Sequence, residues 1–526
     1  MVIFALKKNP SRFLFISFSC IIICGFVRFV SLWYSLKTTT GPSYLFSKTT
    51  DKKFVEKLKT DTLPNSTYSK ISFIDRKHAF TVGEVLTVKI TLFNSMGIRI
   101  RRGGDMLRII LKETKLAANV NGNITDNGDG TYIGTVLLPW RGEPQLVVYL
   151  SLPRQVHEIV VNAANRYGIM RHIMGIFKKY KNISETTPCG PLPVIQGFKN
   201  LYNLTEMAYN MPWYCVKPKS DELTDKHWKY SVTAANFTLP LNVTRVLLAH
   251  QHKPLLKRIV LKVDGEKTME TSRSPCHKLA PEKTWEVGTS GFYYNNTWVN
   301  INCRHQYKQT PNQYAECLQG RHLLLIGDSN IRSYIEFFTK FLRLKVTIGN
   351  PMENAPGVVL GHNRARSISV TWRSHGVPYF AAFPYSNRLL IPTSLILDRL
   401  NVRSDSRTIV VIHLWTHFLT IPIHVVEERI RDVRKAIERL LARAPYVTVV
   451  IKGPQSHLEN QIFLQVDFKR VSFERIWRNE FQYLKNRVIY LNYWDITTGS
   501  ESKQLHPGPK ILDDMVSIFI NHVCNV

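Results

Sequence analysis

Alternating apolar and polar positions mark the N-terminal part of the chain after residue 70. The pattern is clearest at 85–92 and 107–111, and short apolar runs follow at 136–138 and 146–150. A period of two is typical of half-buried strands, and short strands separated by turn sequences about every ten residues predict a β-sandwich. Asp126–Thr131, rich in Asn, Asp and Gly, is one such turn.

From residue 318 onward, apolar strands instead alternate with amphipathic helical stretches. Strands are predicted at 323–326, 409–412, 446–452 and 488–491, and helices at 330–344, 425–441, 468–484 and 515–523. This order predicts a parallel sheet with helices on both faces. Because ligands of such sheets bind beyond the carboxyl ends of the strands, we expect functional side chains there.

These patterns together predict an α/β protein with several domains. We expect an immunoglobulin-like β-sandwich at 71–155 and a three-layer domain with a parallel sheet at 318–526. Between them, 156–317 reads as an irregular connector tied by disulfides, with strands near 246–248 and 259–263. The polar segment 37–70, rich in Lys, Thr and Ser, reads as a stem.

The N-terminus predicts membrane attachment. Lys7, Lys8 and Arg12 precede fifteen uncharged residues, and the apolar character resumes after Arg28. We expect 13–36 to be an uncleaved signal anchor, with 1–12 in the cytosol and the rest of the chain in the lumen. A cleaved signal peptide is the alternative, because the uncharged run alone is short for a membrane span.

Glycosylation sequons and cysteines agree with a lumenal location. Seven Asn-x-Ser/Thr sequons occur, at Asn65, Asn123, Asn182, Asn203, Asn236, Asn242 and Asn295. Of eight cysteines, two lie in the predicted anchor, and the other six are Cys189, Cys215, Cys276, Cys303, Cys317 and Cys524. An even number in an oxidising compartment predicts three disulfides, with fifteen connectivities open. No cysteine or histidine spacing indicates a metal site.

The formal charge of +31 predicts an anionic partner. No zinc-finger, RNP or basic-zipper pattern accompanies this charge, so we expect no nucleic-acid binding. An acidic glycan or a membrane surface fits better. The alternative is a basic surface with no specific partner.

A serine at a predicted strand-to-helix turn is the strongest candidate for chemistry. Gly327, Asp328 and Ser329 follow the 323–326 strand and begin the 330–344 helix. Such an elbow exposes a nucleophile and offers backbone N–H groups to an oxyanion. The alternative is a helix N-cap made by Asp328 or Ser329.

Candidate partners for this serine occur near the end of the chain. His506 lies 177 residues after Ser329, and Asp495 precedes it. A nucleophile first and a histidine near the C-terminus is the order found in the GDSL/SGNH esterase and acyltransferase superfamily. His506 is then the expected general base.

The motifs as a set resemble the NXPE family, whose members combine neurexophilin-like and PC-esterase domains. They are Gly291-Phe292-Tyr293 with Trp298 and Cys303, Cys317-Leu318-Gln319-Gly320, Ile326-Gly327-Asp328-Ser329 with Arg332, Trp415-Thr416-His417-Phe418, Trp494-Asp495 with Thr497, and His506-Pro507. Gly103-Gly104-Asp105 and Asp129-Gly130-Thr131-Tyr132 resemble the neurexophilin-like sandwich. The resemblance covers about residues 70–526.

The resemblance implies an SGNH-like C-terminal domain in which Ser329 is the nucleophile and His506 the base. His417 would stabilise the oxyanion or touch substrate, and Arg332 would pair with Asp328 or hold an acidic substrate. The superfamily's acid normally lies three residues before the histidine, where this chain has Lys503. Asp495 is the expected substitute, and Glu501 a poorer one.

The resulting hypothesis is a type II Golgi or secretory-pathway enzyme that transfers or hydrolyses O-acetyl groups on acidic, sialylated glycans. It would bind no cofactor and would use acetyl-CoA as a co-substrate. The alternatives are a secreted protein and a catalytically inactive, neurexophilin-like binding protein.

Overall fold

The computed structural model describes residues 60–74, 79–158, 173–180, 182–195, 197–233, 255, 258–272, 274–351, 357–379, 389–402, 407–457 and 466–524. Leu58–Val526 forms one compact unit. The predicted cytosolic segment 1–12, the anchor 13–36 and most of the stem lie outside the described residues. Within the described part of the chain, every helix is too short or too polar to cross a bilayer.

Two antiparallel sheets form the N-terminal part of the compact unit. The first sheet runs β1-β3-β7-β6, and the second runs β15-β9-β4-β5-β17-β18. The first comprises β1 (Lys70–Phe73), β3 (Val85–Thr91), β6 (Asn123–Asp126) and β7 (Thr131–Leu137). The second comprises β4 (Met106–Glu113), β5 (Ala118–Asn121), β9 (Gln145–Leu152), β15 (Ile259–Val260), β17 (Gly291–Tyr294) and β18 (Thr297–Asn300).

The apolar positions of both sheets fill one core. Val88 and Tyr132 of the first sheet pack in the same cluster as Ile109 and Val148 of the second. The predicted alternation is therefore confirmed, since Leu86, Val88 and Ile90 are buried while their neighbours in β3 are not. The immunoglobulin-like topology stays a prediction.

The region predicted as an irregular connector contains regular structure. A five-stranded sheet of order β12-β13-β11-β10-β14 occupies its first part. Its strands are β10 (Ile173–Tyr180), β11 (Ile183–Gly190), β12 (Leu201–Asn203), β13 (Tyr214–Val216) and β14 (Trp228–Thr233). Later strands of the region join the N-terminal sheets: β15, β17 and β18 complete the second one. β16 (Val263–Thr268) pairs with β2 (Phe80–Thr81) and β8 (Trp140–Gly142). Residues 71–155 are thus only part of the sandwich. Strands that lie far apart in the sequence pair side by side in its sheets, so later segments of the chain also contribute. The strand expected near 246–248 lies outside the described residues.

A seven-stranded sheet organises the C-terminal domain, in the order β20-β21-β22-β19-β23-β24-β25. The strands are β19 (His322–Gly327), β20 (Lys345–Ile348), β21 (Val358–Asn363), β22 (Ile368–Ser374), β23 (Thr408–His413), β24 (Thr448–Lys452) and β25 (Val488–Leu491). The strands from β22 to β25 in this order are parallel, whereas β20 and β21 form an antiparallel edge. The predicted parallel sheet is confirmed for its central part.

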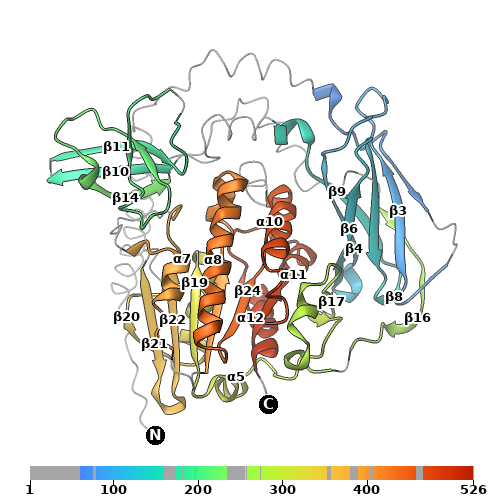
Figure 1. Cartoon of the computed structure of the whole chain (residues 1–526). Helices are drawn as coiled ribbons and strands as arrows, with labels where there is room; N and C mark the ends of the chain where they lie inside the picture. The colour runs from blue at the N-terminus through green and yellow to red at the C-terminus, as the bar shows by residue number, and fades with distance from the viewer. Residues whose placement is uncertain are drawn as a thin grey trace, which may run out of the picture. The chain divides into compact units, whose positions relative to one another are not determined.

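Helices cover both faces of this sheet, as the alternation of side chains in β19 requires. Leu324 and Ile326 pack with α7 (Thr393–Asp398), α8 (Ile423–Arg443) and α10 (Val466–Glu480). Leu323 and Leu325 pack on the opposite side, with α5 (Pro311–Leu318), α6 (Ser329–Phe341) and α12 (Pro509–Val523). Figure 1 shows α8 and α10 side by side across one face of the strands. The result is a three-layer α/β arrangement.

Three disulfides resolve the fifteen connectivities. Cys189 pairs with Cys215, Cys276 with Cys303, and Cys317 with Cys524. The last pair joins α5 to the residue after α12, which ties the two ends of the C-terminal domain together.

Of the sequon asparagines that are described, Asn182, Asn203 and Asn295 are exposed, and Asn65 and Asn123 are half-buried. Asn236 and Asn242 lie outside the described residues.

A buried ion pair connects the N-terminal sheets to the C-terminal domain. Arg108 in β4 makes two hydrogen bonds to the carboxylate of Asp467 in α10, and its guanidinium also donates to Ser456 at 2.8 Å. Both charged side chains are less than a tenth exposed. Burial by itself raises the pKa of Asp467, but the guanidinium outweighs it, and the pKa is lowered.

Candidate active site

A sharp turn between β19 and α6 presents Ser329. Gly327, the last residue of β19, has φ +152°, and a Cβ there would lie 2.3 Å from the carbonyl oxygen of His413. A side chain at 327 would therefore strike the end of the neighbouring strand β23. The next residue turns the chain, and α6 begins at Ser329, one residue before the predicted start, and ends at Phe341, three residues before the predicted end.

Asp328 caps this helix and occupies most of its first amides. Its Oδ1 accepts from the backbone N–H of Asn330, and its carbonyl oxygen accepts from those of Ile331 and Arg332. The N-cap alternative is thus confirmed for Asp328, and it is compatible with a nucleophile at the following position. The N–H of Ser329 is the first of the helix and has no intrahelical partner, so it is the amide suited to an oxyanion.

Ser329 and His506 meet at this turn. The Ser329 Oγ lies 2.7 Å from Nε2 of His506, across 177 residues of sequence. Ser329 is half-buried and His506 is exposed, so the pair is open to solvent. With the imidazole neutral and Nε2 unprotonated, the serine hydroxyl donates to the ring, which is the geometry of a nucleophile and its base.

The charges around His506 favour its neutral form. Although His506 as a residue is exposed, protein atoms around the ring replace part of its water, and this lowers the pKa of His506 below the ordinary 6.5. The nearby Arg332 also lowers this pKa, while Asp328 and Glu336 act in the opposite direction. The ring is therefore largely neutral near pH 7 and able to accept a proton.

Asp495 does not contact His506. Its carboxylate accepts from the Ser290 amide and hydroxyl at 2.8 and 2.9 Å, and from the side-chain amides of Asn121 and Asn492. Asp495 is 3% exposed, at the start of α11 (Trp494–Gly499). The expectation that it supplies the acid is corrected, since its oxygens hold neighbouring segments together instead. Glu501, the poorer candidate, is bonded to Lys112 and Tyr149.

Arg332 and His417 lie in the walls around the turn. Arg332 pairs with Glu336 at 3.0 Å, and its guanidinium lies over the Trp372 ring. His417, after β23, is 7% exposed and its Nδ1 is 3.0 Å from Nε2 of His375. Tyr379 packs edge-on against His417 at 4.7 Å between ring centres. The pairing expected between Arg332 and Asp328 is corrected, since Arg332 pairs with Glu336 one turn further along α6. The acidic substrate expected at Arg332, and the oxyanion or substrate contact expected at His417, stay predictions.

Residues 298–524 match the family described as NXPE family member 4-like, C-terminal domain. The C-terminal domain is therefore an NXPE-family domain. Membership indicates a PC-esterase-like or neurexophilin-like protein, and the match spans both Ser329 and His506.

Beneath the serine, the NXPE domain contains a buried polar network that sequence reasoning missed. Asn330, Thr416, Lys452 and Gln455 are each less than a tenth exposed and are joined by hydrogen bonds. Thr416 also donates its N–H to Asp328 at 3.0 Å. A usable signal was present in the sequence, because Lys452 ends a buried apolar strand and Gln455 follows it closely, the place where α/β sheets bind ligands.

His413 joins the network at the end of β23. Its Nδ1 lies 2.9 Å from the carbonyl oxygen of Lys452, and its Nε2 faces both Lys452 Nζ at 3.4 Å and Asp328 Oδ1 at 4.0 Å. Burial lowers the pKa of His413 well below 6.5 and that of Lys452 to about 7. Burial also raises the pKa of Asp328. Each of these groups is thus shifted toward its neutral form.

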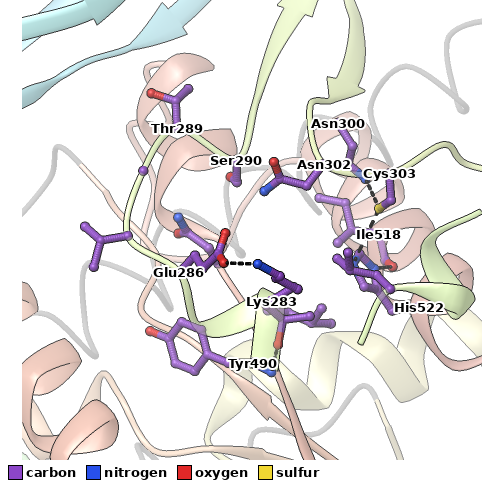
Figure 2. A pocket seen from close by; sticks show the side chains of 16 residues that line it. Lys283, Glu286, Thr289, Ser290, Asn300, Asn302, Cys303, Tyr490, Ile518 and His522 are labelled. Atoms are coloured by element: carbon purple, nitrogen blue, oxygen red, sulfur yellow. Dashed lines mark hydrogen bonds and ion pairs between the residues drawn. The ribbon is translucent and has the colours of Figure 1, made fainter. Parts of the chain in front are cut away.

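Two other features involve none of the residues around Ser329 named so far. Within the described ranges, one group has ligand atoms close enough for a metal, namely Cys276, Cys303 and His522. Its cysteines are joined in a disulfide, so their thiolates are not available to an ion. Next to it, a cavity of about 150 Å³ is lined by residues that include Lys283, Ser290, Asn302 and His522. Figure 2 shows Lys283 and Asn302 turned toward its centre.

Proposed function

We propose that the protein is a lumenal glycan O-acyltransferase or esterase, and more specifically an O-acetyltransferase that acts on acidic, sialylated glycans. The observation that carries this proposal is the 2.7 Å contact between Ser329 Oγ and His506 Nε2 at an open strand-to-helix turn. Acetyl-CoA is the donor that we propose, as a co-substrate. The proposed setting is a membrane of the Golgi or secretory pathway.

In the first half of the reaction, Ser329 Oγ attacks the thioester carbonyl carbon while its proton passes to His506 Nε2. The negative charge on the carbonyl oxygen faces the N–H of Ser329 at the start of α6. Collapse of the tetrahedral species breaks the carbon–sulfur bond. The coenzyme A thiolate leaves and takes the proton from His506.

The second half regenerates the serine. A sugar hydroxyl attacks the acetyl-serine ester and gives its proton to His506, and the serine oxygen then leaves and recovers that proton. An esterase follows the same route with water as the attacking group and an acetylated glycan as the donor. The +31 charge supports an anionic acceptor, because a basic surface attracts sialylated chains.

The decisive experiment follows acetyl groups by mass. The full-length protein would be incubated with acetyl-CoA and a sialoglycan, and in parallel with an O-acetylated sialoglycan in the absence of acetyl-CoA. We expect transfer in the first reaction, and Ser329→Ala to reduce it by about 10⁴-fold or more. Ser333→Ala, in the same helix, is the matched control and should retain activity. If only the second substrate reacts, the protein is an esterase.

A binding protein is the second candidate. Among the described residues, Nδ1 of His506 has no hydrogen-bonding acceptor, and Asp495 is held elsewhere. A histidine without an acidic partner is a weaker base. A fluorophosphonate probe separates the two candidates: labelling that Ser329→Ala abolishes supports the enzyme, and an unreactive Ser329 in folded protein supports the binding protein.

A further inference from the structure

Gln455 lies in the loop that follows β24, under the Ser329 turn. It is 1% exposed, and its backbone carbonyl and both ends of its side-chain amide have partners. The backbone carbonyl accepts from Trp415 Nε1 at 2.9 Å, which fixes the position of the main chain. The side-chain Oε1 accepts from Lys452 Nζ at 2.5 Å.

The contact with Leu505 settles the orientation of the Gln455 amide. The carbonyl oxygen of Leu505 can only accept, so the NH₂ group must face it, and the amide oxygen then faces Lys452 Nζ, which carries N–H donors whether or not it is protonated. That NH₂ group faces two acceptors. It lies 2.9 Å from Oδ1 of Asn330 and 3.4 Å from the carbonyl oxygen of Leu505.

The two acceptors belong to the neighbours of the reacting residues. Asn330 follows Ser329 directly, and Leu505 precedes His506 directly. Asn330 is itself held in place, because its Nδ2 donates to Thr416 Oγ1 at 2.9 Å. A single buried amide therefore bridges the helix start that carries the serine and the loop that carries the histidine.

We propose that Gln455 is a positioning residue that holds His506 against Ser329, through the peptide of Leu505 rather than through the imidazole. In a triad, a carboxylate on Nδ1 orients the ring. Here, instead, Gln455 holds the loop that carries His506 through the backbone carbonyl group of Leu505. The catalytic meaning of this contact rests on the proposed function, but the positioning itself is measurable without any substrate.

The test uses Ser329→Cys, because a thiol paired with a histidine forms a reactive thiolate below its ordinary pKa of about 8.5. The pH dependence of alkylation by iodoacetamide reports the pairing in the full-length protein. With Gln455 intact we expect reaction at pH 6, and adding His506→Ala should move the profile to that of an ordinary thiol. Adding Gln455→Met instead should lower the rate at pH 6 by about tenfold or more.

Asn521→Leu is the matched control for loss of a buried amide. Asn521 is 1% exposed and accepts from the backbone N–H groups of Gln306 and Tyr307, near the C-terminal end of α12. The substitution should lower the melting temperature without moving the alkylation profile. If Gln455→Met fails to fold, Gln455→Glu replaces it in the same experiment. A glutamate keeps the oxygen that accepts from Lys452 but lacks the NH₂ group that donates to Asn330 and Leu505.

The outcomes separate this inference from the proposed function. If the profile depends on His506 but is the same with Gln455→Met or Gln455→Glu in folded protein, the positioning role is wrong while the pair stands. If His506→Ala does not change the profile, the pair itself is absent, and both proposals fail. If Gln455 controls the profile but no acyl transfer or hydrolysis is found, the positioning role stands and only the proposed activity is lost.

Discussion

Ser329 and His506 share a 2.7 Å contact although 177 residues separate them in the sequence. The serine is placed by the turn after β19, in the middle of the sheet, and the histidine by the loop between α11 and α12. The contact therefore depends on the packing of the whole C-terminal domain. It also makes the site sensitive to changes that touch neither side chain.

The pH dependence of Ser329 reactivity should follow the ionisation of His506. The pKa of His506 is lowered by loss of water around the ring, and the base is active only when neutral. The rate of fluorophosphonate labelling should therefore rise with pH and reach half its plateau below pH 6.5. Asp328→Asn removes a charge that raises this pKa, so it should move the midpoint to lower pH. A midpoint above 6.5 in the unaltered protein contradicts the assignment.

Gly327→Ala should disrupt the turn. The substitution combines an unfavourable φ with a Cβ placed 2.3 Å from a backbone oxygen, and backbone atoms cannot rotate away. We expect a loss of about 3 kcal/mol or more in the free energy of unfolding, together with loss of labelling. Gly128→Ala is the control, because Gly128 also has positive φ but a Cβ at that position would meet no other atom within 4 Å. Its cost should be about 1 kcal/mol in denaturant unfolding.

Asp495→Asn should affect stability and leave the chemistry in place. The carboxylate accepts from Ser290, Asn121 and Asn492, and an amide reproduces only part of this set. We expect a loss of about 1–3 kcal/mol in unfolding free energy. The labelling rate per folded molecule should stay within about twofold. A loss comparable with that of His506→Ala would restore Asp495 to the catalytic machinery.

Arg108→Ala should destabilise the contact between β4 and α10. It leaves the buried Asp467 carboxylate without its cation, at an expected cost of about 3–5 kcal/mol in unfolding free energy near pH 7. Because Asp467 has a lowered pKa when folded, the pair stabilises the protein above pH 3.8 and loses that effect as the pH falls through the folded pKa. The double variant Arg108→Met, Asp467→Leu should recover part of the loss. An equal loss in both variants would show that packing, and not charge, holds this contact.

Sequence patterns were most informative where local physics dominates. The period of two at 85–92 predicted the strand β3, and the apolar runs at 323–326, 409–412 and 488–491 predicted β19, β23 and β25 to within two residues at each end. The turn at Gly327–Ser329 was visible because a glycine, a capping residue and a helix occur together. Such strands and turns depend on residues that are close together in the chain, so they can be predicted from the sequence.

Local sequence patterns therefore sufficed for the α/β class, for the helices and strands of the C-terminal domain, and for the serine and histidine most suited to chemistry. Tertiary structure alone decided the disulfide pairing, the strands that 259–300 adds to the N-terminal sheets, and the partners of Asp495. It also revealed the network of Lys452 and Gln455 beneath the serine. Each of these depends on which distant segments become neighbours, and burial and hydrogen-bond satisfaction across the whole fold decide that, not the preference of any one segment.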